Sequence, residues 1–284
     1  MILFEDRAAT VLYNVLISIK QKKFLLPLNV CPIVPDTFLK AKKEFEFVDI
    51  SLDTLCMDYD KAISKIKNDK SIDGVLFVKT FGIDIDSEPF YKEIKGCRDG
   101  IFVIDDMCPS VERFDIDIEN SYADMTLFSS GYSKYIDIGY GGYGFVKEGS
   151  FGSIFEDKQN MQSFLDYKKE IEAKIPLMDK HKATLNRLYK EGIDERYHLG
   201  ERWNRWRFSL LVDNKDEILD EIFKLDGLFA SSHYPQVDFE YVKKPQKNTN
   251  TSAIHSKILN LFNDFRYDEQ KALKTIEVLK RVIR

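Results

Sequence analysis

A single lysine follows a run of hydroxyl and glycine residues near the middle of the chain. The apolar segment Met125–Phe128 leads directly into Ser129-Ser130-Gly131-Tyr132-Ser133-Lys134. Hydroxyl groups and backbone N–H groups at the end of a strand suit a phosphate group. A lysine in a partly apolar site can have a lowered pKa and attack a carbonyl carbon as an amine nucleophile. The same residues are also typical of a glycine-rich hairpin with an exposed lysine, so the segment alone leaves both interpretations open.

Two adjacent carboxylates, Asp105 and Asp106, close an apolar run that begins at Ile101. Carboxylates in such a position face solvent, cap a helix or bind a cation. A buried aspartate could instead pair with the protonated ring nitrogen of a cofactor. Taken alone, these two residues leave open a helix N-cap, a surface turn and a cofactor contact.

Alternating helices and strands would position both motifs. The predicted strands are Phe24–Pro27, Phe45–Ile50, Gly74–Val78, Ile101–Asp106, Met125–Ser129 and Gly144–Val146, and the predicted helices are Ala8–Lys20, Val34–Lys42, Asp58–Ile66 and Pro89–Ile94. Short apolar strands separated by helices indicate an α/β fold, with a mostly parallel sheet that is covered on both faces. The chemistry of such sheets sits at the carboxyl ends of the strands, which directs attention to the residues after Ile104 and Phe128.

The second half of the chain differs in composition and is rich in lysine, glutamate, leucine and methionine. We expect one long helix over Asn160–Tyr189, kinked or broken at Pro176, and a strand in the second half of residues 203–212. Further helices are predicted over Glu217–Lys224, Ser256–Asn263 and Glu269–Val282. The expected organisation is a large domain over residues 1–155, followed by a linking helix and a small α+β domain over residues 156–284.

The overall composition excludes several classes of protein. The 42 basic and 47 acidic residues give a net charge of −5, so the chain has no general attraction for nucleic acid or anionic lipid. No apolar stretch is long enough for a membrane span, and the N-terminal residues do not resemble a signal peptide, so we expect a cytoplasmic protein. The four cysteines are not spaced as zinc ligands, and His181, His198 and His255 have no partner at metal-binding spacing. No metal site is therefore predicted.

The order and spacing of the motifs resemble one known family. Asp105-Asp106 ends a strand, Ser129 stands five residues before Lys134, and Gly141-Gly142 stands seven and eight residues after it. This pattern resembles the DegT/DnrJ/EryC1/StrS sugar aminotransferases, which are fold type I enzymes dependent on pyridoxal 5'-phosphate (PLP). His233-Tyr234-Pro235 resembles the family's His-Tyr-Pro motif, and the resemblance covers nearly the whole chain. It implies a large domain with a mostly parallel sheet and a smaller α+β C-terminal domain.

The resemblance assigns the central chemistry to two residues. Lys134 would form the Schiff base with the cofactor and later move the proton between substrate and cofactor carbons. Asp106 would keep the pyridine nitrogen protonated, so that the ring can accept electrons.

The resemblance also implies a binding site for the cofactor phosphate. Ser129 would bind the phosphate, and Ser133 is a second hydroxyl that would help. The start of the first helix would add backbone N–H donors and a favourable dipole at Ala8, Ala9 and Thr10. The family usually opens this helix with Ser-Gly-Thr, whereas this chain reads Asp6-Arg7-Ala8-Ala9-Thr10.

The chain departs from the family at three further places. Cys31 falls at or near the aromatic residue that stacks on the cofactor ring, and it would pack there as a small apolar residue. Pro109 replaces a glutamine or histidine and has no side-chain donor. Family members also carry a long segment after the Gly-Gly pair that reaches the neighbouring subunit, whereas Val146 leads here quickly to the next helix. We therefore expect a reshaped, more open substrate pocket.

Three residues of the C-terminal part are candidate substrate contacts. Arg207 could grip a carboxylate or a sugar by bidentate hydrogen bonds, although its cluster with Trp203 and Trp206 is also typical of a domain interface. His233 and Tyr234 could approach the cofactor cleft or simply pack the small domain.

The predicted function is a PLP-dependent aminotransferase that acts on a keto-sugar nucleotide or a related metabolite, in surface polysaccharide biosynthesis. It would take its amino group from a small-molecule donor such as glutamate. The resemblance implies a homodimer, because active sites of fold type I lie at a dimer interface. Two alternatives stay open, a PLP enzyme of another type, such as a decarboxylase or lyase, and a catalytically degenerate binding subunit.

Overall fold

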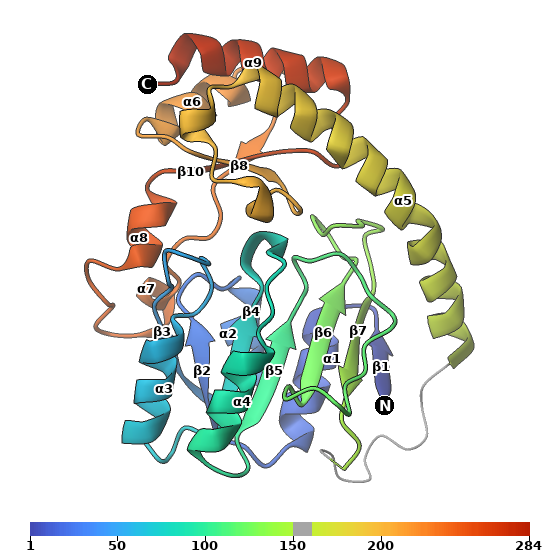
Figure 1. Cartoon of the computed structure of the whole chain (residues 1–284), viewed down its shortest axis with the longest axis vertical. Coiled ribbons are helices and arrows are strands. Elements are labelled where there is room, and N and C mark those ends of the chain that lie inside the picture. The colour runs from blue at the N-terminus through green and yellow to red at the C-terminus, as the bar shows by residue number, and fades with distance from the viewer. Residues whose placement is uncertain (150–160) are drawn as a thin grey trace.

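The computed structural model describes residues 1–149 and 161–284, which form two units joined by a long helix (Figure 1). We call residues 1–149 the large unit and residues 193–284 the small unit. The predicted domain boundary between residues 155 and 156 lies outside the described residues, so the division at that point stays a prediction.

Seven strands of the large unit form one mixed sheet in the order β1-β7-β6-β5-β4-β2-β3. Strands β2 to β6 run parallel, β7 pairs antiparallel with β6, and β1 pairs antiparallel with β7. The predicted α/β class with a mostly parallel sheet is confirmed. The strand bounds are Ile2–Glu5 (β1), Lys23–Pro27 (β2), Glu44–Val48 (β3), Gly74–Val78 (β4), Phe102–Asp106 (β5), Met125–Ser129 (β6) and Gly142–Val146 (β7).

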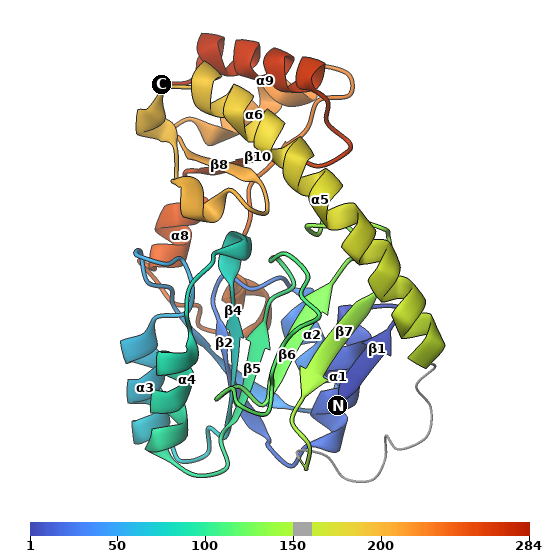
Figure 2. The ribbon, with the colours of Figure 1, turned by 45° about the vertical axis from the view of Figure 1, so that its right-hand side comes forward.

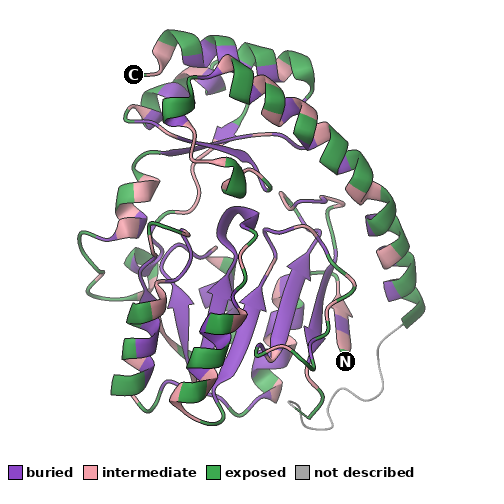
Figure 3. Cartoon of the chain, viewed as in Figure 1, coloured by how far each residue is buried: buried purple, intermediate pink, exposed green. Residues whose placement is uncertain are grey.

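Helices cover both faces of this sheet (Figure 2). The helices α1 (Ala8–Ser18) and α2 (Ile33–Lys40) bury their apolar side chains on one face. The helices α3 (Tyr59–Asn68) and α4 (Glu88–Cys97) pack on the other. Every residue of β4, β5, β6 and β7 is buried, as Figure 3 shows, because these central strands are covered on both sides.

The long helix α5 (Met161–Gly192) runs from the sheet of the large unit to the small unit (Figure 2). Phe164, Tyr167 and Ile171 pack into the core of the large unit, whereas Leu185 and Tyr189 belong to the core of the small unit. The helix continues without a break through Pro176. Pro176 is exposed, as is Glu172 one turn earlier, so the carbonyl group that proline leaves without an N–H donor can face water.

A second, antiparallel sheet with the order β8-β10-β9 forms the centre of the small unit. Its strands are Phe208–Leu211 (β8), Ala230–Ser231 (β9) and Ile258–Leu261 (β10), and its helices are Lys215–Phe223 (α6) and Glu269–Val282 (α9). The predicted helix over Ser256–Asn263 is wrong, because this segment contains the central strand β10, paired on both sides and entirely buried. A short apolar run without clear periodicity does not distinguish a buried strand from a buried helix.

Two short helices return the chain of the small unit to the large unit, beside β3 in Figure 1. They are α7 (Asp238–Tyr241) and α8 (Asn250–His255). The Asp49 carboxylate after β3 accepts the backbone N–H groups of Asn250 and Thr251, at 2.8 and 3.1 Å. Short 3₁₀ turns complete the described elements at Thr80–Gly82, Glu195–Tyr197 and Glu201–Trp203.

Gly142 marks the closest approach between the sheet and the start of α1. It lies in β7, opposite Glu5 of β1 and Ser129 of β6. A Cβ atom built on Gly142 would lie 2.0 Å from the Ala8 backbone nitrogen and 2.3 Å from the Ala8 Cα. Backbone atoms cannot rotate away as a side chain can, so only glycine allows the helix to begin at this position.

We therefore expect Gly142→Ala to destabilise the protein by roughly 1–3 kcal/mol or more, because the added methyl group overpacks the contact with α1. Urea denaturation measures this loss as a lower free energy of unfolding. Gly96→Ala in α4 is the matched control, since nothing outside its chain neighbours and the helix backbone lies within 4 Å of its added Cβ. Equal stabilities of the two variants would contradict the steric argument.

Candidate active site

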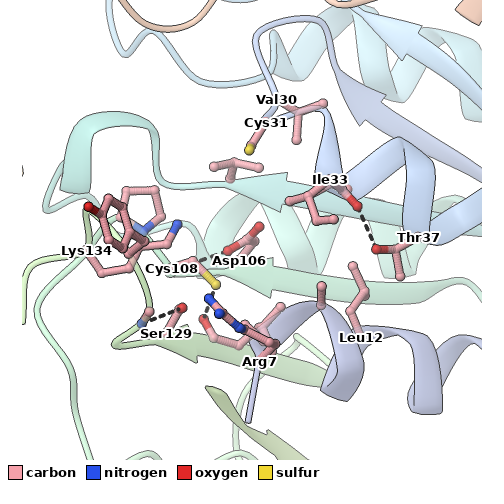
Figure 4. Close-up of a pocket in the computed structure, with 18 of the residues that line it drawn as sticks. Arg7, Leu12, Val30, Cys31, Ile33, Thr37, Asp106, Cys108, Ser129 and Lys134 are labelled. Carbon is pink, nitrogen blue, oxygen red and sulfur yellow. Dashed lines mark hydrogen bonds between the residues drawn. The ribbon is translucent and has the colours of Figure 1, made fainter. Parts of the chain in front are cut away.

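A cavity of about 250 Å³ lies at the carboxyl ends of the parallel strands, against the first turn of α1 (Figure 4). Seven of the residues predicted to form the site line it, namely Ala8, Ala9, Cys31, Asp106, Ser129, Lys134 and Tyr234. The other four predicted site residues, Thr10, Ser133, Arg207 and His233, lie outside its lining. Both motifs that the sequence places after Ile104 and Phe128 therefore converge on one space.

Lys134 reaches the cavity from the loop that follows β6. Figure 4 shows its amine directed toward the same space as the Asp106 carboxylate and the Arg7 guanidinium. Burial lowers the pKa of the Lys134 amine, but the acidic groups around it, the Asp106 carboxylate among them, raise that pKa more, so that the net direction is upward. This direction differs from the lowered pKa that the sequence suggests, and the amine has to lose a proton before it can act as a nucleophile.

Asp106 and Asp105 point to opposite faces of the sheet, as consecutive strand residues do. Asp106 lines the cavity, and its Oδ1 accepts the backbone N–H of Cys108 at 2.9 Å. Burial raises its pKa, so its charged form favours a cationic partner in the cavity. Asp105 lies behind the sheet, 4.0 Å from the Lys79 ammonium, and burial raises its pKa to about 6. The alternation thus leaves one carboxylate for the cavity.

A polar corner of the cavity is formed by Ser129 and the start of α1. Gly131 donates its backbone N–H to the Ser129 hydroxyl at 3.3 Å, and a Cβ on Gly131 would lie 3.7 Å from Arg7 Nη1. Thr10 does not contribute as predicted, because its side chain is exposed and its backbone N–H donates to the Arg7 carbonyl. The corner therefore combines a hydroxyl, a helix N-terminus and a guanidinium, which together suit a phosphate group.

Arg7 is the site residue that the motif comparison missed. It precedes α1 with an extended backbone, and its side chain makes no hydrogen bond to the helix. Within the described ranges, no carboxylate forms an ion pair with its guanidinium. The sequence signal was a cation directly before a helix whose first turn was expected to bind phosphate.

The positions that depart from the family pattern also lie in the cavity. Cys31 and Pro109 both line it. Tyr234 enters from the small unit and stacks on Phe81 and Trp206, with ring centroids 6.0 Å apart in each pair. An aromatic side chain therefore reaches the cavity from the small unit, while a thiol occupies the side where an aromatic residue was expected.

Ser133, Arg207 and His233 belong to the contact between the two units. The Ser133 hydroxyl accepts a hydrogen bond from Arg207 Nη2 at 3.1 Å. Burial lowers the pKa of His233 to about 4, so this imidazole is neutral at physiological pH. The three residues thus surround the cavity without lining it.

Neither a metal site nor a membrane-spanning helix is present in the parts of the chain that the structure describes. No group of three or more histidine, cysteine, aspartate or glutamate side chains is arranged to hold a metal ion there. Nor is any helix of residues 1–149 and 161–284 long and apolar enough to cross a membrane.

Comparison with known proteins identifies the fold. No protein-family model and no curated protein sequence matches the chain. A DegT DnrJ EryC1 StrS aminotransferase from Brucella abortus has a TM-score of 0.71 at 17% identity, over 99% of this chain and 85% of the other. NtdA from Bacillus subtilis, solved with bound cofactor PMP, gives 0.75 at 17% identity, over 99% and 72%. DesI, solved with its TDP-sugar product, gives 0.79 at 14% identity, over 99% and 80%.

These similarities establish that the chain has the fold of PLP-dependent sugar aminotransferases, as predicted. The cavity with Lys134 and Asp106 therefore lies in a fold that this chain shares with those structures over 99% of its length. At such low identities the role of each residue has to be argued from its own surroundings.

Glu112 is a buried carboxyl group beside the backbone of Ile136, in the loop that carries Lys134, and it was not singled out in the sequence. It is 2% exposed, and its polar neighbours are its own backbone N–H and that of Ile136, which lower its pKa less than burial raises it. Burial raises its pKa to about 8, so the folded protein keeps this group protonated at neutral pH. An unfolded chain would lose that proton near the ordinary glutamate pKa of about 4.3.

We expect Glu112→Gln to remove a pH-dependent loss of stability. Between about pH 4.3 and pH 8 the folded state binds the proton and the unfolded state does not, so native stability falls as pH rises through this window. Glutamine mimics the neutral acid, so the variant's advantage should grow by up to about 1.4 kcal/mol per pH unit and level off above about pH 8. Urea denaturation at several pH values measures it. Glu191→Gln, at an exposed position of α5, is the control, and parallel curves for all three proteins would refute the argument.

Proposed function

We propose that this protein is a PLP-dependent aminotransferase that transfers an amino group to a keto-sugar nucleotide or a related metabolite. The observation that carries the proposal is the convergence of Lys134, Asp106 and Ser129 on one cavity, from the ends of neighbouring strands β5 and β6. The fold shared with sugar aminotransferases, one of them solved with a TDP-sugar product, supports this class of substrate.

The residues of the cavity match the groups of PLP. The Asp106 carboxylate, which burial makes receptive to a cation, would hold the ring nitrogen in its protonated form. Ser129, Arg7 and the backbone at Ala8 and Ala9 would bind the phosphate, since they form the polar corner. The Lys134 amine would meet the aldehyde carbon. One cavity therefore offers a partner to each polar end of the cofactor.

The positions of Lys134 and Asp106 in the cavity suggest a chemical role for each residue. When bound, PLP supplies an electron sink for the bonds around the amine-bearing carbon of the substrate. Lys134, whose amine lines the same cavity, would take up the proton from the substrate carbon and return it to the cofactor carbon. Asp106, which is fixed at the end of β5, would keep a negative charge available for the protonated ring nitrogen.

Several finer features are part of the same proposal. Cys31 and Pro109 leave the cavity less enclosed than an aromatic residue and a hydrogen-bonding side chain would, which suits a bulky acceptor. We also propose a cytoplasmic homodimer, an amino donor such as glutamate, and a role in surface polysaccharide biosynthesis. Sedimentation of the purified protein tests the dimer.

The first test is cofactor capture by the purified protein. With added PLP, the native protein should develop an absorbance band that borohydride reduces, and peptide mapping should then find the added mass on Lys134. Lys134→Ala should abolish both signals. Lys215→Met is the control, because Lys215 in α6 is a buried lysine whose pKa is also lowered by burial, and it lies outside the lining of the cavity, so its loss should leave capture intact.

The outcome separates the alternatives that the sequence leaves open. Bleaching of the band by an amino donor, with recovery by a keto-sugar nucleotide, supports transamination, whereas release of carbon dioxide or an eliminated product would indicate another PLP reaction. If native protein captures no PLP at saturating concentration, the enzyme proposal fails and a binding role takes its place.

Arg7→Met tests the phosphate corner separately. We expect its affinity for PLP to fall roughly ten- to hundredfold, the range of a lost charge-assisted hydrogen bond. Its affinity for pyridoxal, which lacks the phosphate, should not change. Isothermal titration with both ligands measures the difference, and Arg187→Met, at an exposed position on α5, is the control. An equal loss for both ligands would contradict a phosphate contact.

A further inference from the structure

The residue before Lys134 has an unusual backbone conformation. Ser133 has φ of +60°, in the left-handed region that side chains other than glycine rarely adopt. Such a conformation persists only where surrounding contacts enforce it, and it is common where a backbone must present a functional group. The contacts that hold Ser133 therefore determine where the Lys134 side chain begins.

Those contacts come from the small unit. The Trp206 indole donates its Nε1–H to the Ser133 carbonyl at 2.7 Å. The Ser133 hydroxyl accepts Arg207 Nη2 at 3.1 Å and Arg266 Nη2 at 3.4 Å. Asp137 of the same loop completes the arrangement, accepting the Ser133 backbone N–H at 2.8 Å. Three side chains of the small unit thus form hydrogen bonds with a single residue of the Lys134 loop.

The side chains of Trp206 and Arg207, which bind Ser133, are themselves fixed by packing and hydrogen bonds. Trp206 is 5% exposed and stacks on Phe81 and Tyr234, and its carbonyl accepts the Lys182 ammonium at 2.8 Å. The Arg207 guanidinium lies 4.3 Å from the ring centroid of Trp206 and 3.7 Å from that of Phe262. The donors are therefore fixed before they meet Ser133, so little side-chain freedom is lost in the contact.

Tyr135, the residue after Lys134, is bound by side chains of α5. The Tyr135 hydroxyl donates to Asp179 of α5, and the Lys182 ammonium lies 4.9 Å from the centre of the Tyr135 ring. Both chain neighbours of Lys134 are therefore anchored, while the Lys134 side chain makes no hydrogen bond within residues 1–149 and 161–284. Its orientation depends on the backbone that carries it.

We propose that Trp206, supported by Arg207, is a positioning residue that fixes Ser133 in its left-handed conformation and thereby aims the Lys134 amine into the cavity. The inference rests on the proposed role of Lys134 as the residue that captures PLP. It replaces the predicted phosphate role of Ser133 with that of an anchor, and the predicted substrate role of Arg207 with that of a clamp. The small unit then sets the reactivity of a lysine that belongs to the large unit.

Trp206→Phe removes the indole donor and keeps an aromatic ring. The chain offers a matched control in its other tryptophan, because Trp203 Nε1 also donates to a backbone carbonyl, that of Thr54, at 3.1 Å. We expect Trp206→Phe to slow PLP capture at Lys134 by roughly two- to tenfold, the range for one lost hydrogen bond, and Trp203→Phe to leave it unchanged. Affinity for pyridoxine 5'-phosphate, which has no aldehyde, should be unchanged in both variants, since it needs no lysine.

Two further measurements keep a structural effect apart from a positioning effect. Amide hydrogen exchange of residues 131–138 without cofactor should be faster in Trp206→Phe than in native protein and in Trp203→Phe. The double variant Ser133→Gly, Trp206→Phe should recover part of the capture rate, because glycine adopts positive φ without strain. Equal capture and equal exchange in the two tryptophan variants overturns the proposal. So does a parallel loss of pyridoxine 5'-phosphate affinity, which would mean a general disturbance of the fold.

The same set of experiments separates the positioning role from the proposed function. If native protein captures no PLP, the aminotransferase proposal fails, and hydrogen exchange still decides whether Trp206 holds the loop. Faster exchange in Trp206→Phe alone supports the clamp, whereas unchanged exchange overturns it.

Discussion

Parallel strands end at the same edge of a sheet, and this constraint determines where the chemistry of the protein lies. In β5 and β6, Asp106 stands opposite Leu127, so Ser129 and the loop to Lys134 emerge beside the carboxylate. The antiparallel β7 then returns Gly142 to the same edge and, because it has no side chain, lets α1 begin there. Strand register thus brings the carboxylate and the start of the Lys134 loop to the polar corner beside α1.

Contacts from the small unit also help to frame the cavity. Asp49 binds the start of α8 with a charged acceptor, which fixes the returning chain against β3. Trp206 and Arg207 fix Ser133 from the opposite direction. The cavity is therefore framed by one rigid sheet edge and one set of polar contacts, and most of the side chains that make those contacts are buried.

The sequence predicted the parts of this arrangement that depend on local pattern. The strands β4 and β6 were predicted with their observed bounds, because Gly74–Val78 and Met125–Ser129 are apolar runs with polar or glycine flanks. Strand β10 was mistaken for helix because only pairing with β8 and β9 defines it. The sequence did not show that Ser133 lies outside the cavity lining and bonds Arg207, since a hydroxyl next to a lysine gives the same local pattern in either position. Contacts between segments 70 or more residues apart leave no local signal.

The helix α5 gives the protein a particular order of assembly. The ring of Tyr143, on β7, lies against Phe164 and Tyr167 of α5, which the ribosome makes only after the whole sheet. Leu185 and Tyr189, farther along α5, pack into the core of the small unit. A nascent chain that ends before α5 therefore exposes an aromatic surface on one face of the sheet, whereas the core between the other face and α1 and α2 contains no residue of α5.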